Sequence, residues 1–156
     1  MNNSEYMKKA CELSELSVKR GGGPFGCVIC AHDGEIVGKG HNMVTINNDP
    51  TQHAEIVAIR DACRFLNTFD LSGCTLYTSC EPCPMCLSAI YWSHIHHVYY
   101  GNNRKDAKNI GFDDEYIYDE IKKPLEDRNV KMLQCCKDDA KDTFQLWLEK
   151  DDKFCY

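Results

Sequence analysis

Hydrophobic residues recur at intervals of three or four positions near the start of the chain. This spacing, typical of one face of an amphipathic helix, is carried by Tyr6, Ala10, Leu13 and Leu16. The helix is predicted to end at the glycines of residues 21–23. A mostly apolar run follows at residues 25–30, and the turn sequence Asp33-Gly34 separates it from a second run at residues 35–42. The pattern therefore predicts a β-hairpin, and the glycines of its second strand predict a bulge or a close backbone approach.

Helical and extended patterns alternate after the hairpin. A helix is predicted from about residue 51, with Ile56, Ile59 and Cys63 on its buried face, and another from Pro84 to about Trp92. Three further strands are predicted, at residues 74–77, 96–100 and 130–134. A last amphipathic helix is marked by Ala140, Phe144, Trp147 and Leu148. This order predicts an α/β fold with a five-stranded mixed sheet covered on both faces, which is a three-layer α/β/α sandwich.

Composition limits the classes of function. The chain has 156 residues, 43% hydrophobic and 27% charged, so one globular domain over residues 1–156 is expected rather than disorder. No apolar run approaches the ~20 residues of a membrane span, and the N-terminus lacks the basic and apolar regions of a signal peptide, so no membrane association is expected. The net charge of −6 disfavours the broad basic surface that nucleic acids require, and it favours a small molecule over a nucleic acid as the partner.

The number of cysteines is high for such a chain. There are 11 of them, an odd number, and no export signal is expected from the first residues. Both features argue against a disulfide framework and favour reduced thiols in the cytoplasm. Most of these cysteines are expected to pack as small apolar residues, while a minority bind metal or react.

Two short segments carry the strongest chemical signal, His53-Ala54-Glu55 and Pro82-Cys83-Pro84-Met85-Cys86. Cys83 and Cys86 lie across a predicted helix start, where both sulfurs can face one metal ion. One imidazole and two thiolates suit zinc, and three protein ligands leave a fourth position open for water, as in catalytic sites. Glu55 is placed to act on that water as a general base and then as a general acid. The spacing matches the H-x-E…P-C-x-x-C signature of zinc-dependent nucleobase deaminases.

Other interpretations exist for single members of this set. A Cys-x-x-Cys pair alone also occurs in redox pairs and in structural zinc sites. Cys80 forms an overlapping pair with Cys83 and is interpreted as a spare thiol, because it precedes the predicted helix. Cys27 and Cys30 share the spacing but fall on a strand, where residues three apart face opposite sides, so both are expected in the core. The joint match of both segments favours catalytic zinc.

Longer motifs surround these segments and extend over nearly the whole chain. They are Gly23-Pro24-Phe25-Gly26, Asn47, Asp49-Pro50-Thr51, Tyr77-Thr78-Ser79-Cys80-Glu81, Ala89-Ile90-Tyr91-Trp92, Gly111-Phe112-Asp113-Asp114, Ile117-Tyr118 and Tyr156. With them the chain resembles the cytidine deaminase superfamily and, within it, the bacterial guanine deaminases. The zinc motifs are common to the superfamily, whereas the Phe-Asp-Asp…Ile-Tyr segment and the final tyrosine point to guanine as the substrate.

The resemblance implies a cytidine deaminase-like fold and hydrolysis of guanine to xanthine and ammonia, a step of purine metabolism. It implies one Zn²⁺ per subunit, with Glu55 as the catalytic carboxylate and the metal ligands His53, Cys83 and Cys86. By the same resemblance, Asn42 would bind the polar edge of the base, and Phe25 and Trp92 would line its ring or stack on it. Asp114 would contact guanine or assist proton transfer, and Tyr156 would help to close the pocket. It also implies a homodimer in which the segment of about residues 138–156 crosses to the partner's active site.

Two other functions are also compatible with the sequence. A tRNA adenosine deaminase, or a deaminase of cytosine or of another base or nucleoside, would share every zinc residue, although a nucleic-acid substrate fits poorly with the charge of −6. A zinc module without enzymatic activity, for interaction or redox sensing, would give Glu55 no role. The carboxylate therefore distinguishes an enzyme from a binding module.

Overall fold

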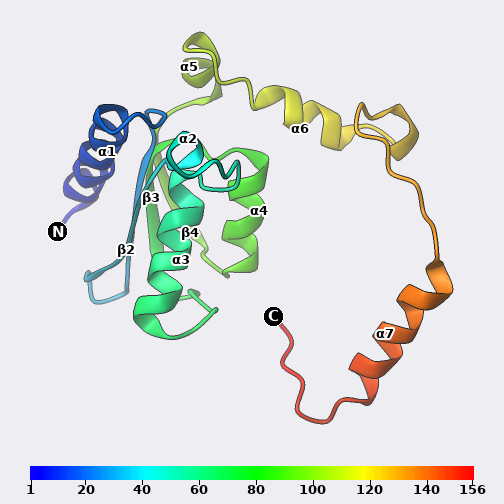
Figure 1. The fold of residues 1–156 in the computed structure, drawn as a ribbon. Helices are drawn as coiled ribbons and strands as arrows, with labels where there is room; N and C mark the ends of the chain where they lie inside the picture. The colour runs from blue at the N-terminus through cyan, green and yellow to red at the C-terminus, as the bar shows by residue number, and fades with distance from the viewer. The chain divides into compact units, whose positions relative to one another are not determined.

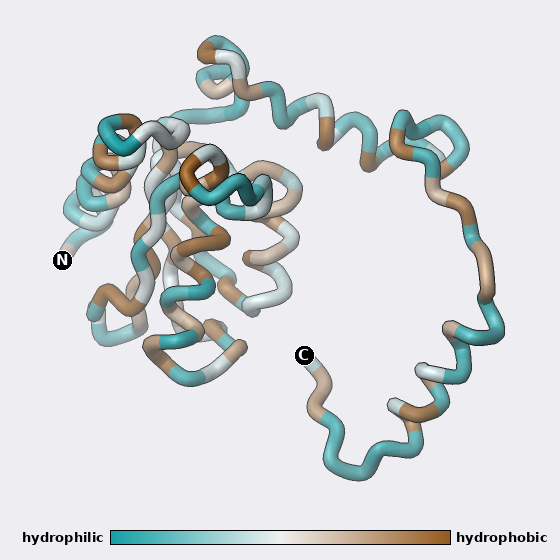
Figure 2. The backbone as a smooth tube through the Cα atoms, viewed as in Figure 1, coloured by the Kyte–Doolittle hydropathy of each residue, from teal (hydrophilic) through white to brown (hydrophobic).

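The computed structural model describes residues 1–156, and the chain divides into two compact units, Met1–Tyr118 and Asp119–Tyr156 (Figure 1). The first unit contains the whole sheet and most of the helices. The hydrophobic residues of the second unit are dispersed among hydrophilic ones (Figure 2). No helix combines the length and the apolar character that crossing a bilayer would need.

The sheet of the first unit is mixed, as predicted. Its strands are β1 (Gly26–Cys30), β2 (Ile36–His41), β3 (Thr75–Cys80) and β4 (His97–Asn102), in the spatial order β2-β1-β3-β4. β1 pairs antiparallel with β2 and β3, whereas β3 and β4 are parallel. Parallel neighbours need a crossover, and helix α4 (Pro84–Trp92) supplies it.

Helices cover both faces of this sheet, which confirms the three-layer arrangement (Figure 1). Helix α1 (Asn3–Lys19) packs on one face, and α3 (Ala54–Leu66) with α4 covers the other. The side chains of β1 alternate between the layers: Cys27 and Ile29 belong to the core under α3, and Val28 and Cys30 to the core under α1. The expectation that Cys27 and Cys30 are core residues on opposite faces is confirmed.

The contact between α3 and β2 differs from the prediction in its buried residues. The face that is fully buried consists of Ala54, Ala58 and Ala62, while Ile56, Ile59 and Cys63 are only partly buried. The cause lies in β2, where a Cβ on Gly38 would come within 2.5 Å of the Ala58 carbonyl oxygen. A Cβ on Gly40 would come within 2.3 Å of the Ala54 carbonyl oxygen. Small residues on both surfaces let the helix backbone approach the strand, as the glycines of this strand predicted.

Three shorter helices follow the strands β2 and β4 along the chain. They are α2 (Val44–Asn47), α5 (Arg104–Asn109) and α6 (Glu115–Lys122), which extends into the second unit. The second unit also contains a 3-10 turn, η1 (Leu125–Asp127), and the predicted last helix, α7 (Lys137–Glu149).

The predicted fifth strand at residues 130–134 is wrong, because the sheet has four strands and this segment is not among them. Its apolar side chains are exposed, with Val130 at 73% and Leu133 at 91% of their full accessibility. A strand exists only where a neighbour supplies its backbone hydrogen bonds, and the alternation of side chains does not specify that neighbour.

Candidate active site and metal centre

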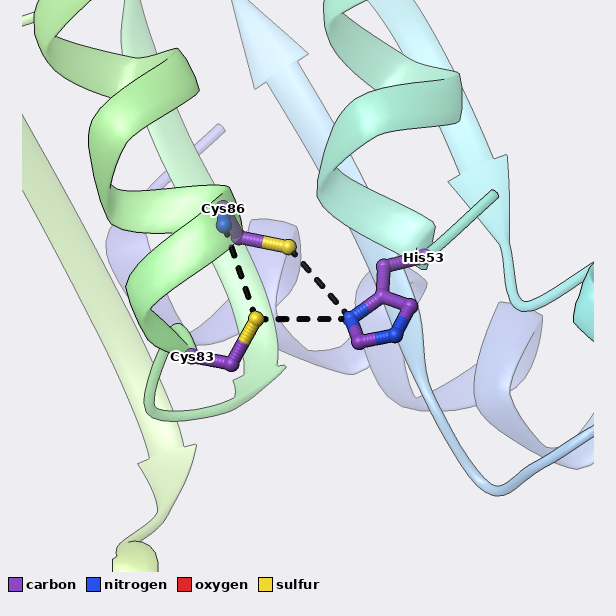
Figure 3. A group of neighbouring side chains, drawn as sticks. All are labelled: His53, Cys83 and Cys86. Atoms are coloured by element: carbon purple, nitrogen blue, oxygen red, sulfur yellow. Dashed lines mark hydrogen bonds between the residues drawn. The ribbon is translucent and has the colours of Figure 1, made fainter. Parts of the chain in front are cut away.

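Two helix starts bring the three predicted metal ligands together (Figure 3). His53 is the N-cap residue of α3, Cys83 is the N-cap of α4, and Cys86 lies in the first turn of α4. The Nδ1 atom of His53 lies 3.5 Å from the Cys83 sulfur and 3.6 Å from the Cys86 sulfur. All three ligand atoms lie within 4.8 Å of one another. Pro84 at the start of α4 lacks the N–H that this position would leave unpaired.

These distances fit zinc. Zinc–sulfur bonds of ~2.3 Å and zinc–nitrogen bonds of ~2.0–2.1 Å at a tetrahedral angle place sulfur and nitrogen about 3.6 Å apart. The two observed nitrogen–sulfur distances, 3.5 and 3.6 Å, agree with that separation. With three protein ligands, one tetrahedral position remains for water or substrate, which is typical of catalytic zinc.

The pKa shifts of the two thiols are also consistent with a site for a cation. The hydrogen bond from the Cys86 side chain, supported by His53 and by the backbone N–H of Cys86, lowers the pKa of Cys83 to about 4. The same contact and burial raise the pKa of Cys86. The two shifts have opposite directions because the thiols interact with each other, and a cation bound between them would favour the thiolate form of both.

Glu55 lies beside this cluster in the first turn of α3 and is only 6% exposed. Its Oε1 accepts a hydrogen bond of 3.1 Å from the Thr78 hydroxyl, and its Oε2 accepts one of 3.4 Å from the Cys86 thiol. Burial raises the pKa of the Glu55 carboxyl. A carboxyl oriented by the Thr78 hydroxyl, with a raised pKa, is suited to accept and return a proton. Thr78 was not among the predicted site residues, because only the pairing of β3 with β1 places it against α3.

A cavity of about 540 Å³ opens onto His53, Glu55 and Cys83. Its size is within the range of small-molecule sites. Its remaining lining comes mainly from the glycine loop, the segment after β2 and the segment before α6: Gly21, Gly22, Gly23, Phe25, Asn42, Val44, Thr45, Pro50, Cys80, Glu81, Met85, Ala107, Phe112, Asp113, Asp114 and Ile117. Three predicted substrate residues, Phe25, Asn42 and Asp114, are therefore in the same cavity as the metal cluster.

The hairpin register places two of these residues next to each other. Gly26 pairs with His41, and the next pair outward is Phe25 with Asn42, whose N–H donates to the Phe25 carbonyl at 3.0 Å. The Asn42 side-chain oxygen accepts from the N–H of Val44 at 3.2 Å and of Gly23 at 3.5 Å. Since a backbone N–H can only donate, these bonds fix the orientation of the amide and leave its NH₂ group available as a donor.

Across the cavity, Phe112 packs edge-to-face against Phe25, with ring centroids 4.9 Å apart. Phe112 belongs to a motif that the sequence singled out, but its ring was not assigned a role. The Oδ1 atom of Asp114 is buried without a hydrogen-bond partner, and burial raises the pKa of this carboxyl. An unpaired buried acceptor in a cavity is suited to an N–H donor of a ligand.

Residues 1–102 match the zinc-binding region that defines the cytidine and deoxycytidylate deaminases. The chain belongs to this family. Guanine deaminase of Bacillus subtilis (strain 168) is 49% identical over 148 residues, which is 94% of this chain and 94% of the relative. The X-ray structure of guanine deaminase from Bacillus subtilis has a TM-score of 0.96 and 47% identity over 100% of this chain and 99% of that chain. The tRNA-specific adenosine deaminase of Aquifex aeolicus is 43% identical over 98 residues, 63% of this chain and 64% of the relative.

Family membership accounts for the deaminase-like α/β fold and for the zinc-binding character of the cluster. Cys80 lies outside the group of three ligands although it lines the cavity. Burial raises the pKa of its thiol to about 12. All eleven cysteines are free in this deaminase.

Two predicted substrate residues are not among the lining residues of the cavity. Trp92 is the last residue of α4, nine residues long, so it lies about 13 Å along the helix from the cysteine end and is 63% exposed. Tyr156 belongs to the second unit and is 74% exposed. No spacing or motif along the chain distinguishes these two residues from Phe25 and Asn42.

Proposed function

We propose that this chain is a zinc-dependent guanine deaminase, an enzyme that hydrolyses guanine to xanthine and ammonia. The observation that carries the choice of substrate is the likeness to a guanine deaminase over 94% of the chain, which extends beyond the zinc-binding region of residues 1–102. The observation that favours an enzyme over a binding module is the buried Glu55 beside a three-ligand cluster. A zinc module for interaction or redox sensing has no use for that carboxyl.

His53, Cys83 and Cys86 would hold one Zn²⁺ per subunit. Bound zinc supplies a Lewis acid that makes water a nucleophile near neutral pH. Glu55 accepts a proton from the attacking water through one carboxylate oxygen, and Thr78 holds the other. Glu55 passes this first proton to N3 of guanine as the water oxygen adds to C2 and the C2=N3 double bond opens. It then takes the proton of the new C2 hydroxyl and gives it to the amine, so that C2=O forms as the bond from C2 to the leaving ammonia breaks. The overall step consumes one water and releases one ammonia.

The cavity supplies contacts for the rest of the base. We assign the NH₂ group of Asn42 as a donor to an acceptor on the polar edge of guanine. The Phe25 ring, held by Phe112, packs on the purine. The unpaired Asp114 oxygen accepts from a ring N–H or the amine, or assists proton transfer there. A site that pairs these groups discriminates strongly against bases that lack them.

We further propose that the active protein is a homodimer and that residues 1–156 form one domain whose segment of about residues 138–156 is exchanged between subunits. Support comes from the exposed aromatic side chains of the second unit, among them Phe144, Phe154 and Tyr156. Trp92 is also largely exposed and absent from the cavity of its own chain. Contact of Trp92 or Tyr156 with guanine would then occur in the partner's cavity.

A free base is favoured over a nucleic acid. The net charge of −6 offers little attraction for phosphates, and the tRNA-specific adenosine deaminase from Aquifex aeolicus matches only 63% of this chain. We propose a cytoplasmic location, which fits a chain whose eleven cysteines are all unpaired.

A screen of substrates tests the proposal. Purified protein with bound zinc would be assayed spectrophotometrically with guanine, guanosine, cytosine, adenosine and a tRNA stem-loop. We expect xanthine from guanine at a kcat/KM well above that for every other substrate. Higher kcat/KM with the stem-loop or with cytosine would refute guanine as the substrate.

A further inference from the structure

The segment before α6 borders the cavity but has few internal supports. Phe112, Asp113, Asp114 and Ile117 line the cavity, yet no residue of α6 is fully buried. Apart from the Phe112 ring, which packs on Phe25, no buried apolar side chain holds this segment and α6 in place. Lys108 contacts Asp113 at 3.7 Å and Glu115 at 3.3 Å, but all three side chains are about half exposed, and such ion pairs add little rigidity.

The best-defined support is Tyr118. Its hydroxyl donates a hydrogen bond of 2.7 Å to the carbonyl oxygen of Pro82, the residue before Cys83. The guanidinium of Arg104 lies over the Tyr118 ring, 3.7 Å from its centroid. Tyr118 therefore has two partners, one at its hydroxyl and one on its ring face.

Arg104 is itself fixed to the residue before Pro82. Its Nε donates to one carboxylate oxygen of Glu81 at 2.8 Å, and its backbone N–H donates to the other at 3.0 Å. The N–H of Glu81 in turn donates to the Asn102 carbonyl at 2.8 Å, next to the paired ends of β3 and β4. The platform under Tyr118 is therefore anchored to the sheet.

We propose that Tyr118, seated on Arg104, is a positioning residue that holds the Asp114 carboxyl in the cavity. The two residues are one helical turn apart, and the Tyr118 N–H donates to the Asp114 carbonyl at 3.2 Å. Fixing the Tyr118 hydroxyl to Pro82 thus fixes the first turn of α6 and Asp114, the residue directly before that helix. The inference rests on the proposed function, because the role of Asp114 in guanine binding is part of that proposal.

The physical reason is the unpaired state of Asp114. Its Oδ1 is buried without a partner, which disfavours this conformation until a donor from the substrate arrives. Without an anchor, α6 could turn this carboxyl toward water, and the site would have to reorder it each time guanine binds. The contact of Tyr118 with Pro82 keeps the Asp114 carboxyl in the cavity before guanine binds. The site therefore favours bases that offer an N–H donor to this carboxyl.

The test is a double-mutant cycle between Tyr118→Phe and Asp114→Ala in the full-length, zinc-loaded protein. Tyr118→Phe removes only the hydroxyl and keeps the ring under Arg104. We expect kcat/KM for guanine to fall about three- to tenfold, the range for loss of one hydrogen bond, with unchanged zinc content. In the Asp114→Ala background the same change should alter kcat/KM less than about twofold, because the group it positions is gone. Tyr100→Phe, an exposed tyrosine on β4 without a hydrogen bond at its hydroxyl, is the matched control and should behave as the wild type.

Three results would overturn the inference while leaving the proposed function intact. Kinetics of Tyr118→Phe equal to those of Tyr100→Phe would show that the hydroxyl has no part. An equal loss in both Asp114 backgrounds would show that Tyr118 does not act through Asp114. Parallel loss of zinc would show that the contact supports only the metal segment. Absence of xanthine with the wild-type protein would overturn the proposed function, and the inference with it.

Discussion

The approach of α3 to β2 predicts how one methyl group would affect the metal site. In Gly40→Ala the new Cβ would lie 2.3 Å from the Ala54 carbonyl oxygen and 2.6 Å from the Ala58 nitrogen. Both are backbone atoms of the helix, so they cannot rotate away as a side chain would. The first turn of α3 must shift, and that turn follows His53 and carries Glu55.

The size of the effect follows from the cost of overpacking, which is about 1–3 kcal/mol for an added methylene in a tight core. For a chain of this length, 1 kcal/mol lowers Tm by about 2–4 °C, so Gly40→Ala should lower Tm by about 2–12 °C. The displaced His53 should also release zinc more readily. Gly38→Ala, whose Cβ would contact Ala58 and Ala62 further along the helix, should lose comparable stability with less effect on zinc.

Scanning calorimetry of the zinc-loaded proteins, together with zinc transfer to a chromophoric chelator, measures both effects. Gly73→Ala is the matched control, because its Cβ would meet no atom within 4 Å, and its Tm should stay close to that of the wild type. If Gly40→Ala and Gly73→Ala had the same Tm and the same rate of zinc release, the close contact of α3 with β2 would not position the metal ligands.

Three further predictions concern the cluster and its surroundings. Thr78→Val removes a donor to Glu55 and should lower kcat about tenfold with zinc retained; unchanged kcat would mean that the hydroxyl does not orient the carboxyl. By metal analysis, Cys80→Ala should keep one zinc per chain, whereas Cys86→Ala should lose it. The opposite result would mean that Cys80 binds the zinc instead of Cys86. Removal of zinc with a chelator should lower Tm, because a ligand that binds only the folded state at 100 times its Kd stabilises it by about 2.7 kcal/mol, and an unchanged Tm would contradict a metal site formed by folding.

The parts of the fold that sequence predicted depend on local chemistry. The Asp33-Gly34 turn specified the hairpin, and the hairpin register then placed Phe25 beside Asn42. Proline at the first position of α4 and the spacing of the two cysteines specified a helix start with both sulfurs on one side. Each of these features is decided by residues a few positions apart, so one sequence suffices to recognise it.

The parts that sequence did not predict depend on contacts between distant residues. Gly38 and Gly40 decide which face of α3 is buried. Because they lack a Cβ, the helix backbone comes so close to β2 that only alanine side chains fit between them. Residues 130–134 have the alternation of a strand but lack a neighbour with which to pair. Thr78 and Tyr118 acquire their contacts with Glu55 and Pro82 only after the chain has folded, across 23 and 36 residues of sequence.

Ammonia release by Glu55→Gln, measured beside the wild type with guanine as substrate, tests whether the Glu55 carboxyl carries the proton in guanine hydrolysis. The glutamine keeps the size of the side chain and a hydrogen-bond acceptor, but it cannot take up the proton of the attacking water. We predict that the variant retains the wild-type Tm and one zinc per chain while its kcat falls by at least about 100-fold, the lower end of what general acid–base catalysis contributes. Release of ammonia from guanine by the variant at the wild-type rate would show that Glu55 is not the general base of the reaction.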